Sequence, residues 1–120
     1  MICVKGIHHV SINVVDVAQA THFYEHVIGL QRLDRPQFSF PGAWLQAGDQ
    51  QVHLVGINSG SPLKEQHFAF HVDDVDNIRT WLVECECSVT ETKTVDGICR
   101  QIFTRDPSGN LLEFNQPIVA

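Results

Sequence analysis

The chain has 120 residues and an ordinary globular composition, which suits one compact domain with a hydrophobic core. Its formal net charge of −6 disfavours nucleic acid and anionic membrane surfaces as partners, because both require a basic footprint. The sequence has neither an apolar run of about 18 residues nor a signal-peptide pattern, so a cytoplasmic location is expected.

The first half of the chain predicts a strand, a helix and three further strands. Residues 7–14 alternate between apolar and polar and are rich in β-branched side chains, which is typical of a strand. Asp16 is expected to cap a helix over residues 17–28, and Gly29 is expected to end it. The three strands are expected near residues 30–35, 43–47 and 50–56.

The second half predicts the same elements in the same order. Residues 66–72 form the first strand of this half, and Asp74 caps a helix over residues 75–85. Asp96-Gly97 and residues 106–109 are expected to form turns. The three later strands are expected near residues 88–95, 98–104 and 110–115.

The two halves also repeat one sequence pattern. H-x-x-x-x-V-x-D-V occurs at residues 9–17 and again at residues 67–75. A second match relates residues 49–54 to residues 109–114. Self-similarity of this kind indicates one structural unit used twice. We therefore expect one domain, residues 1–120, built from a module over about residues 5–57 and a module over about residues 65–117.

The alternation of side chains predicts what each face of the strands carries. Each module's first and last strands have one strongly apolar face, which should pack on the helices. The opposite face is more polar and should line a cleft. Four candidate ligands share it: His9, His53, His67 and Glu113.

Three imidazoles and one carboxylate on a concave face predict a metal site. Such groups are costly to bury without a partner, and a divalent ion removes that cost by coordinating them. Imidazole nitrogen and carboxylate oxygen suit one ion of Zn, Ni, Fe, Co or Mn. Three of the four remaining histidines, His8, His22 and His26, are interpreted as ordinary surface residues. The four cysteines match no zinc motif and are expected to be reduced thiols without a role in the chemistry: Cys3, Cys85, Cys87 and Cys99.

Three segments resemble the vicinal oxygen chelate superfamily: IHHVSINVVDVAQATHFYEHVIGL, QHFAFHVDDVD and TRDPSGNLLEFNQP. This superfamily includes glyoxalase I, fosfomycin and bleomycin resistance proteins, methylmalonyl-CoA epimerase and extradiol dioxygenases. The resemblance covers nearly the whole chain. It implies an α+β fold in which two tandem βαβββ modules form a curved mixed sheet around a metal-binding cleft.

The resemblance also implies a reaction. A glyoxalase I-like lyase or isomerase would act on a small substrate with two neighbouring oxygens, through a metal-stabilised enediolate. Glu113 or His53 would move the proton. The chain would be a homodimer, as members of the superfamily commonly are. Five residues are candidates to line the cleft, although His71 and Trp44 are equally compatible with ordinary structural roles: Asn13, Trp44, His71, Gln101 and Phe103.

Other activities of the superfamily stay open. His53 stands where glyoxalase I usually has a glutamate that takes part in proton transfer. The alternatives are an extradiol-type dioxygenase, a fosfomycin-type thiol transferase and a metal-free drug-binding protein of the bleomycin-resistance kind. The four filled ligand positions count against the last of these.

Overall fold

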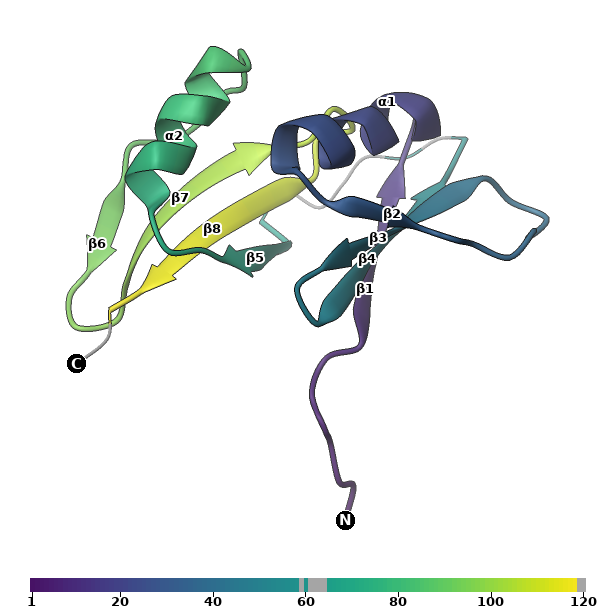
Figure 1. Cartoon of the computed structure of the whole chain (residues 1–120), viewed down its shortest axis with the longest axis horizontal. Coiled ribbons are helices and arrows are strands. Elements are labelled where there is room, and N and C mark those ends of the chain that lie inside the picture. The colour runs from purple at the N-terminus through teal and green to yellow at the C-terminus, as the bar shows by residue number, and fades with distance from the viewer. Residues whose placement is uncertain (59, 61–64, 119–120) are drawn as a thin grey trace. The chain divides into compact units, whose positions relative to one another are not determined.

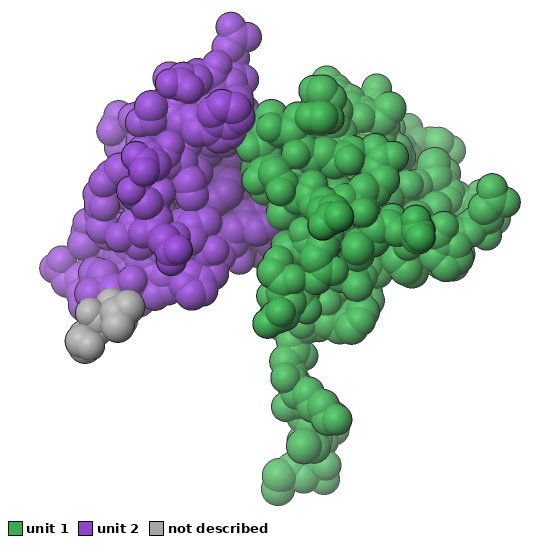
Figure 2. All heavy atoms as spheres, viewed as in Figure 1, with its two compact units in different colours: residues 1–60 green, residues 61–120 purple. Residues whose placement is uncertain are grey.

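The structure is a computed structural model that describes residues 1–58, 60 and 65–118. The chain divides into two compact units, residues 1–60 and residues 61–120, which Figure 2 shows in different colours. Each unit contains its own sheet and its own core. That the two units form one domain stays a prediction.

The first unit has the predicted order of a strand, helical segments and three strands (Figure 1). The strand β1 leads into the α-helix α1 and the π-helical segment η1, and the strands β2, β3 and β4 follow. Their bounds are β1 His9–Val14, α1 Val17–His22, η1 Phe23–Ile28, β2 Gln31–Leu33, β3 Gly42–Ala47 and β4 Gln50–Gly56.

The second unit repeats this order (Figure 1). Its elements are β5 His67–His71, α2 Val75–Glu84, β6 Lys93–Val95, β7 Cys99–Arg105 and β8 Leu111–Pro117. The expected α+β fold of two tandem βαβββ modules is therefore confirmed. Among the described residues, no helix has the length and apolar character that crossing a bilayer requires.

The two sheets have the same topology. Their strand orders are β1-β4-β3-β2 and β5-β8-β7-β6. In each sheet the first and last strands of the unit are parallel neighbours, and the other pairs are antiparallel. The strands that carry the candidate ligands therefore lie side by side within each unit.

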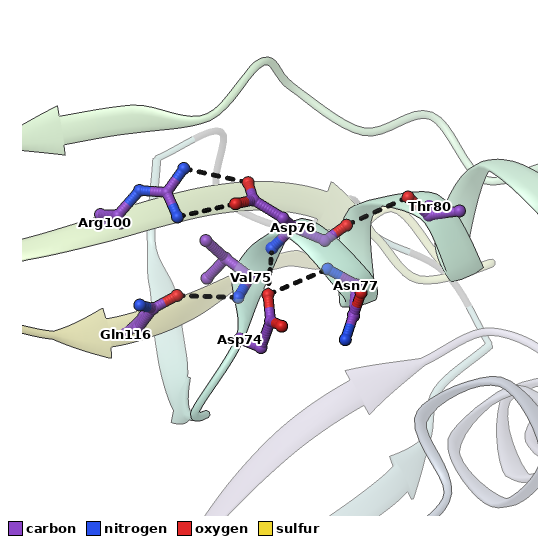
Figure 3. A network of polar contacts seen from close by, with 7 residues as sticks. All are labelled: Asp74, Val75, Asp76, Asn77, Thr80, Arg100 and Gln116. Carbon is purple, nitrogen blue, oxygen red and sulfur yellow. Dashed lines mark hydrogen bonds and ion pairs between the residues drawn. The ribbon is translucent and has the colours of Figure 1, made fainter.

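Aspartate caps begin both helices, as predicted. The Asp16 carboxylate accepts a hydrogen bond from the Gln19 N–H at 3.0 Å. The Asp74 carboxylate accepts from the Asp76 and Asn77 N–H groups, both at 3.1 Å (Figure 3). These bonds satisfy N–H groups that the first helical turn leaves without partners. Gly29 ends the helical segment of the first unit at a φ of 90°, a conformation that favours glycine.

The apolar faces of the strands form the two cores. In the first unit, α1 packs against β3 and β4, and the side chains of Tyr24 and Leu54 are fully buried. In the second unit, α2 packs against β7 and β8, and Leu82 and Leu112 are fully buried. Burial of large side chains of this kind contributes about 1.5–3 kcal/mol each. The prediction that the apolar faces pack on the helices is confirmed for the last strand of each module, β4 and β8, and for β1 and β5 it stays a prediction.

Three predicted elements differ in their details. The first strand begins at His9 instead of residue 7. The helix predicted over residues 17–28 is π-helical in its second half, because apolar spacing does not distinguish an α-turn from a wider one. The strand predicted over residues 88–95 is regular only in β6. Before β6, Thr90 Oγ1 accepts the Phe103 N–H, so a side chain replaces part of the backbone ladder.

Candidate metal centre

The candidate ligands lie in two pairs, one in each unit. His9 and His53 come from the parallel neighbours β1 and β4, and His67 and Glu113 from β5 and β8. Across the described ranges 1–58, 60 and 65–118, no three His, Cys, Asp or Glu side chains form a ready metal-binding group. The fit to a metal ion is therefore a property of each pair by itself.

The pair in the second unit consists of a buried carboxylate and an imidazole. His67 Nε2 lies 3.1 Å from Glu113 Oε1. Glu113 is only 6% exposed, which would be costly for an unpartnered carboxylate. Its second oxygen, Oε2, accepts hydrogen bonds from Asn115 Nδ2 at 2.8 Å and Gln101 Nε2 at 3.1 Å. The carboxylate is thus held in one orientation, with Oε1 facing the imidazole.

A backbone carbonyl orients the His67 ring. His67 Nδ1 lies 2.9 Å from the Glu65 carbonyl oxygen, which accepts only from an N–H, so Nδ1 carries a proton. A carbonyl in this place is the usual outer partner of a metal-binding histidine, because it turns the other nitrogen toward the ion. Two donors about 2.1 Å from a common ion, at an angle of about 95°, are about 3.1 Å apart. The separation of these two donor atoms is therefore compatible with a common ion, and without an ion it is the distance of a hydrogen bond or ion pair.

The pair in the first unit is stacked. The rings of His9 and His53 have centroids 4.1 Å apart and an interplanar angle of 15°. Trp44 covers the other face of His53 at 4.4 Å and 8°. Imidazole binds a metal through a lone pair in the ring plane, and no ion at bonding distance can lie in two nearly parallel planes. His9 and His53 therefore fit a common ion only after at least one ring rotates.

Polar neighbours surround this stack. His53 Nε2 lies 2.8 Å from Gln51 Oε1, and His9 Nδ1 lies 2.8 Å from His8 Nδ1. Burial, followed by the charges of His9, His8 and Arg35, lowers the pKa of His53. A lowered pKa favours the neutral imidazole, which is the form that binds a metal.

Alternation over the strand expected at residues 7–14 would place His8 and His9 on opposite faces, but the His8 ring contacts the His9 ring, so the alternation is wrong at this end of the strand. The strand begins only at His9, so strict alternation does not extend to residue 8. The His8 ring is free to turn toward His9, with centroids 5.1 Å apart at an angle of 85°.

The predicted cleft residues occupy different places. Gln101 donates to Glu113, and Phe103 contacts the His67 ring edge-on with centroids 5.4 Å apart. Trp44 is half-buried on the ligand face and stacked on His53, so it does not join the core. Asn13 and His71 are exposed on the ligand faces of β1 and β5. Their roles toward a substrate stay predictions.

Sequence reasoning missed three residues that hold the donors: Gln51, Glu65 and Asn115. Gln51 and Asn115 could have been found, because each lies two positions from a candidate ligand on the same strand and so shares its face. Glu65 contributes only its carbonyl, for which side-chain chemistry gives no signal. All four cysteines are free thiols, and burial raises the pKa of the Cys87 thiol.

Comparison with known proteins agrees with this fold. The model of the Glyoxalase/Bleomycin resistance protein/Dioxygenase superfamily matches residues 6–114. Glyoxylase I 4 of Arabidopsis thaliana is 25% identical over 90% of this chain and 68% of its own length. Metallothiol transferase FosB of Staphylococcus haemolyticus is 27% identical over 93% of this chain and 84% of its own.

A solved structure shares the same architecture. The crystal structure of a glyoxalase family protein from Bacillus anthracis superposes with a TM-score of 0.88 at 24% identity. The match covers 98% of this chain and 99% of that one. The chain therefore belongs to the glyoxalase, bleomycin resistance protein and dioxygenase superfamily, whose members are mostly metal-dependent enzymes.

Proposed function

We propose that the chain is a metal-dependent enzyme of the glyoxalase I type, a lyase or isomerase acting on a small substrate with two neighbouring oxygen atoms. The observation that carries the proposal is the pair of His67 and Glu113, whose donor atoms lie 3.1 Å apart. Three fixed neighbours hold the pair: the Glu65 carbonyl, Gln101 and Asn115. Membership of the superfamily supports the same conclusion.

The proposed metal site uses all four candidate ligands. His67 and Glu113 would bind one divalent ion together with His9 and His53, after the stacked rings of the first unit rotate. Three neutral imidazoles and one carboxylate suit Zn, Ni, Fe, Co or Mn. When bound, the ion supplies Lewis-acid polarisation of the substrate oxygens.

The protein side chains would then orient the substrate and move the proton. Glu113 Oε1 is the proposed proton acceptor, because Gln101 and Asn115 occupy Oε2 and leave Oε1 on the imidazole side. Burial of Glu113 excludes water from this carboxylate. His53 is the alternative acceptor, since burial lowers its pKa and so favours the neutral ring.

Metal loading and hemithioacetal turnover test this proposal. The full chain is stripped of metal, reloaded separately with Zn, Ni, Fe, Co and Mn, and assayed with methylglyoxal and glutathione. Turnover should require a metal and should be lost in Glu113→Gln. Glu91→Gln is the matched control, since it removes an exposed carboxylate of the same unit and should leave turnover unchanged. A wild-type chain that binds none of these metals would contradict the proposal.

A second candidate is transfer of a thiol of the fosfomycin-resistance type. Two observations favour it: the similarity to a metallothiol transferase and the presence of His53 where glyoxalase I usually has a glutamate. The same metal-loaded protein, mixed with fosfomycin and a thiol, should then consume both at equal rates. Assembly as a homodimer stays a prediction, which the mass measured by light scattering checks.

A further inference from the structure

The loop between β2 and β3, residues 34–41, places an arginine against two phenylalanine rings. The Arg35 guanidinium carbon lies 4.8 Å from the centroid of Phe38 and 5.0 Å from that of Phe40. Arg35 Nη2 also donates a hydrogen bond to the Phe40 carbonyl at 2.9 Å. These contacts hold the guanidinium in place at low conformational cost.

The Arg35 guanidinium lies on the same face of the sheet as His53. Gly42 and Trp44 share one face of β3, and Trp44 pairs with His53 across β4. A Cβ added to Gly42 would come 2.3 Å from the Leu54 carbonyl oxygen, 3.0 Å from Arg35 Nη2 and 3.2 Å from its Cζ. The backbone of β4 is therefore the first obstacle to a side chain at residue 42, and the Arg35 guanidinium lies beside the same position.

The equivalent place in the second unit holds a neutral amide. Gly42 pairs with Val55 in the first sheet, and Gln101 pairs with Asn115 in the second. Gln101 holds the Glu113 carboxylate from this position. In the first unit, a cation brought by the loop occupies the space over Gly42.

Among the described residues, the guanidinium N–H groups of Arg35 make no ion pair with a carboxylate. Other arginines pair with carboxylates, as Arg32 does with Glu25 and Arg100 with Asp76. In the part of the chain that the structure describes, no carboxylate lies within ion-pair distance of Arg35. The positions of β1, β3 and β4 that share its face, all between residues 9 and 56, include no Asp or Glu. This face is locally positive in a chain with net charge −6.

A row of aromatic rings extends from the loop at residues 34–41 to His53. The centroid distances are 5.3 Å from Phe40 to Phe38, 6.0 Å from Phe38 to Trp44 and 4.4 Å from Trp44 to His53. Phe38 and Phe40 are 45% and 42% exposed, although both are large and apolar. A ligand with a flat carbon skeleton would cover these rings while its charged group meets Arg35.

We propose that Arg35 binds an anionic group of the substrate, a carboxylate, phosphonate or phosphate, while the ring row contacts its carbon skeleton. The guanidinium fork matches the two oxygens that each of these groups presents. As a statement about the substrate, the inference rests on the proposed function. The binding of the anion itself requires no metal, so the two can fail separately.

Phenylphosphonate is a suitable probe, because it joins an aromatic ring to a phosphonate. The full chain is passed over a chelating resin, and binding is followed by Trp44 fluorescence in a Trp81→Phe background, where Trp44 is the remaining tryptophan. Diethyl phenylphosphonate supplies the same ring without the charge. The variants are Arg35→Gln, Arg35→Lys and, as the matched control, Arg32→Gln, which removes a positive charge from the same unit at its pair with Glu25.

The expected result is saturable binding that Arg35→Gln weakens by about 10- to 100-fold. Arg35→Lys should lie between Arg35→Gln and the wild type, because it keeps the charge but not the fork. Arg32→Gln should bind like the wild type. Thermal unfolding of each variant checks that the fold is kept. If Arg35→Gln does not fold, the comparison uses Arg35→Lys and the uncharged diethyl ester instead.

Three results would overturn the inference: no saturable binding of phenylphosphonate, equal binding of the uncharged ester, or equal losses in Arg35→Gln and Arg32→Gln. Arg35-dependent binding in a chain that takes up no metal would support the anion site and contradict the proposed enzyme. Metal-dependent turnover without any Arg35-dependent binding would support the enzyme and contradict the anion site.

Discussion

In the second unit, His67 and Glu113 point their donor atoms at each other, whereas in the first unit His9 and His53 lie face to face. The backbone does not cause this difference, because the registers match. His9 pairs with Gln51, two positions before His53, and His67 pairs with Leu111, two positions before Glu113. We attribute the difference to the side chains that surround each pair.

Those neighbours differ in polarity. Gln101 and Asn115 hold the Glu113 carboxylate, while the equivalent positions of the first unit are Gly42 and Val55. Gly42 and Val55 offer no amide to His53, whose ring is stacked on Trp44 and lies 2.8 Å from Gln51 Oε1 through Nε2. In the proposed metal site, the second unit would supply a pair whose donor atoms already converge, and the first unit a pair that must rearrange. A pair that is already arranged loses less free energy on binding.

The largest expected effect is on metal affinity when a donor of the second unit is removed. His67→Ala should weaken binding by more than the about 100-fold that changes outside the ligand set can cause. His9→Ala should weaken metal binding about tenfold less than His67→Ala does. The free energy needed to unstack the His9 and His53 rings offsets part of the binding free energy that His9 contributes. Isothermal titration with Mn or Zn measures both, and equal losses would remove the distinction between the pairs.

The next effect concerns the amides that hold each pair. Gln101→Leu should lower metal affinity by about tenfold, because Glu113 Oε2 loses a donor. Gln51→Leu should change affinity less, since its contact with His53 Nε2 belongs to the stacked arrangement. The two variants are matched in chemistry, so a reversed order in the same titration would show that the first unit is the better arranged one.

A smaller, spectroscopic effect should report the rearrangement directly. Metal binding should change the emission of Trp44 in a Trp81→Phe background, because His53 leaves the face of the indole. The change should saturate with the metal and be absent in His53→Ala. Emission that stays constant while the metal binds would mean that the stack persists in the loaded protein.

The smallest effect lies outside the site. Among the described residues, the first turn of α2 has an ion pair and the first turn of α1 has none. Arg100 donates to both Asp76 oxygens, at 2.8 and 3.0 Å, while the first turn of α1 has no acidic residue (Figure 3). The hydrogen bond to Arg100 lowers the pKa of Asp76 below its ordinary value of 3.8. The stabilisation is therefore present above that pH and is lost as the pH falls below it.

Arg100→Gln should lower the Tm only slightly, because both side chains are partly exposed. The difference in Tm from the wild type should be constant from neutral pH down to about pH 4 and should shrink below it. Calorimetry across this range measures the difference. Asp76→Asn should lower the Tm by the same amount. A double variant whose Tm falls much further than that of either single variant would contradict the assignment of this ion pair.

Most of the fold could be predicted from the sequence, because alternation and caps are local signals. The Asp16 and Asp74 caps and the strand at residues 50–56 were placed correctly. The strand predicted over residues 88–95 is regular only at Lys93–Val95, since Thr90 uses its hydroxyl where a regular strand would use backbone.

For the candidate site, the sequence could predict only which face of each strand carries the ligands. A period of two places His53 and Glu113 on the faces opposite the cores, but it does not fix their rotamers. Whether His53 stacks or points outward depends on Trp44, which comes from another strand. Arg35 lies in a loop without periodicity, so no sequence pattern connected it with the His53 face.

In β4, one face of the strand packs in the core and the opposite face carries a candidate ligand. Val52 and Leu54 secure the hydrophobic interior, while His53 between them points to the other side. Replacing the residue at position 53 need not disturb the interior, so selection can exchange one chemistry for another while the scaffold persists. Such tolerance offers a physical reason why a single superfamily unites glyoxalases, resistance proteins and dioxygenases.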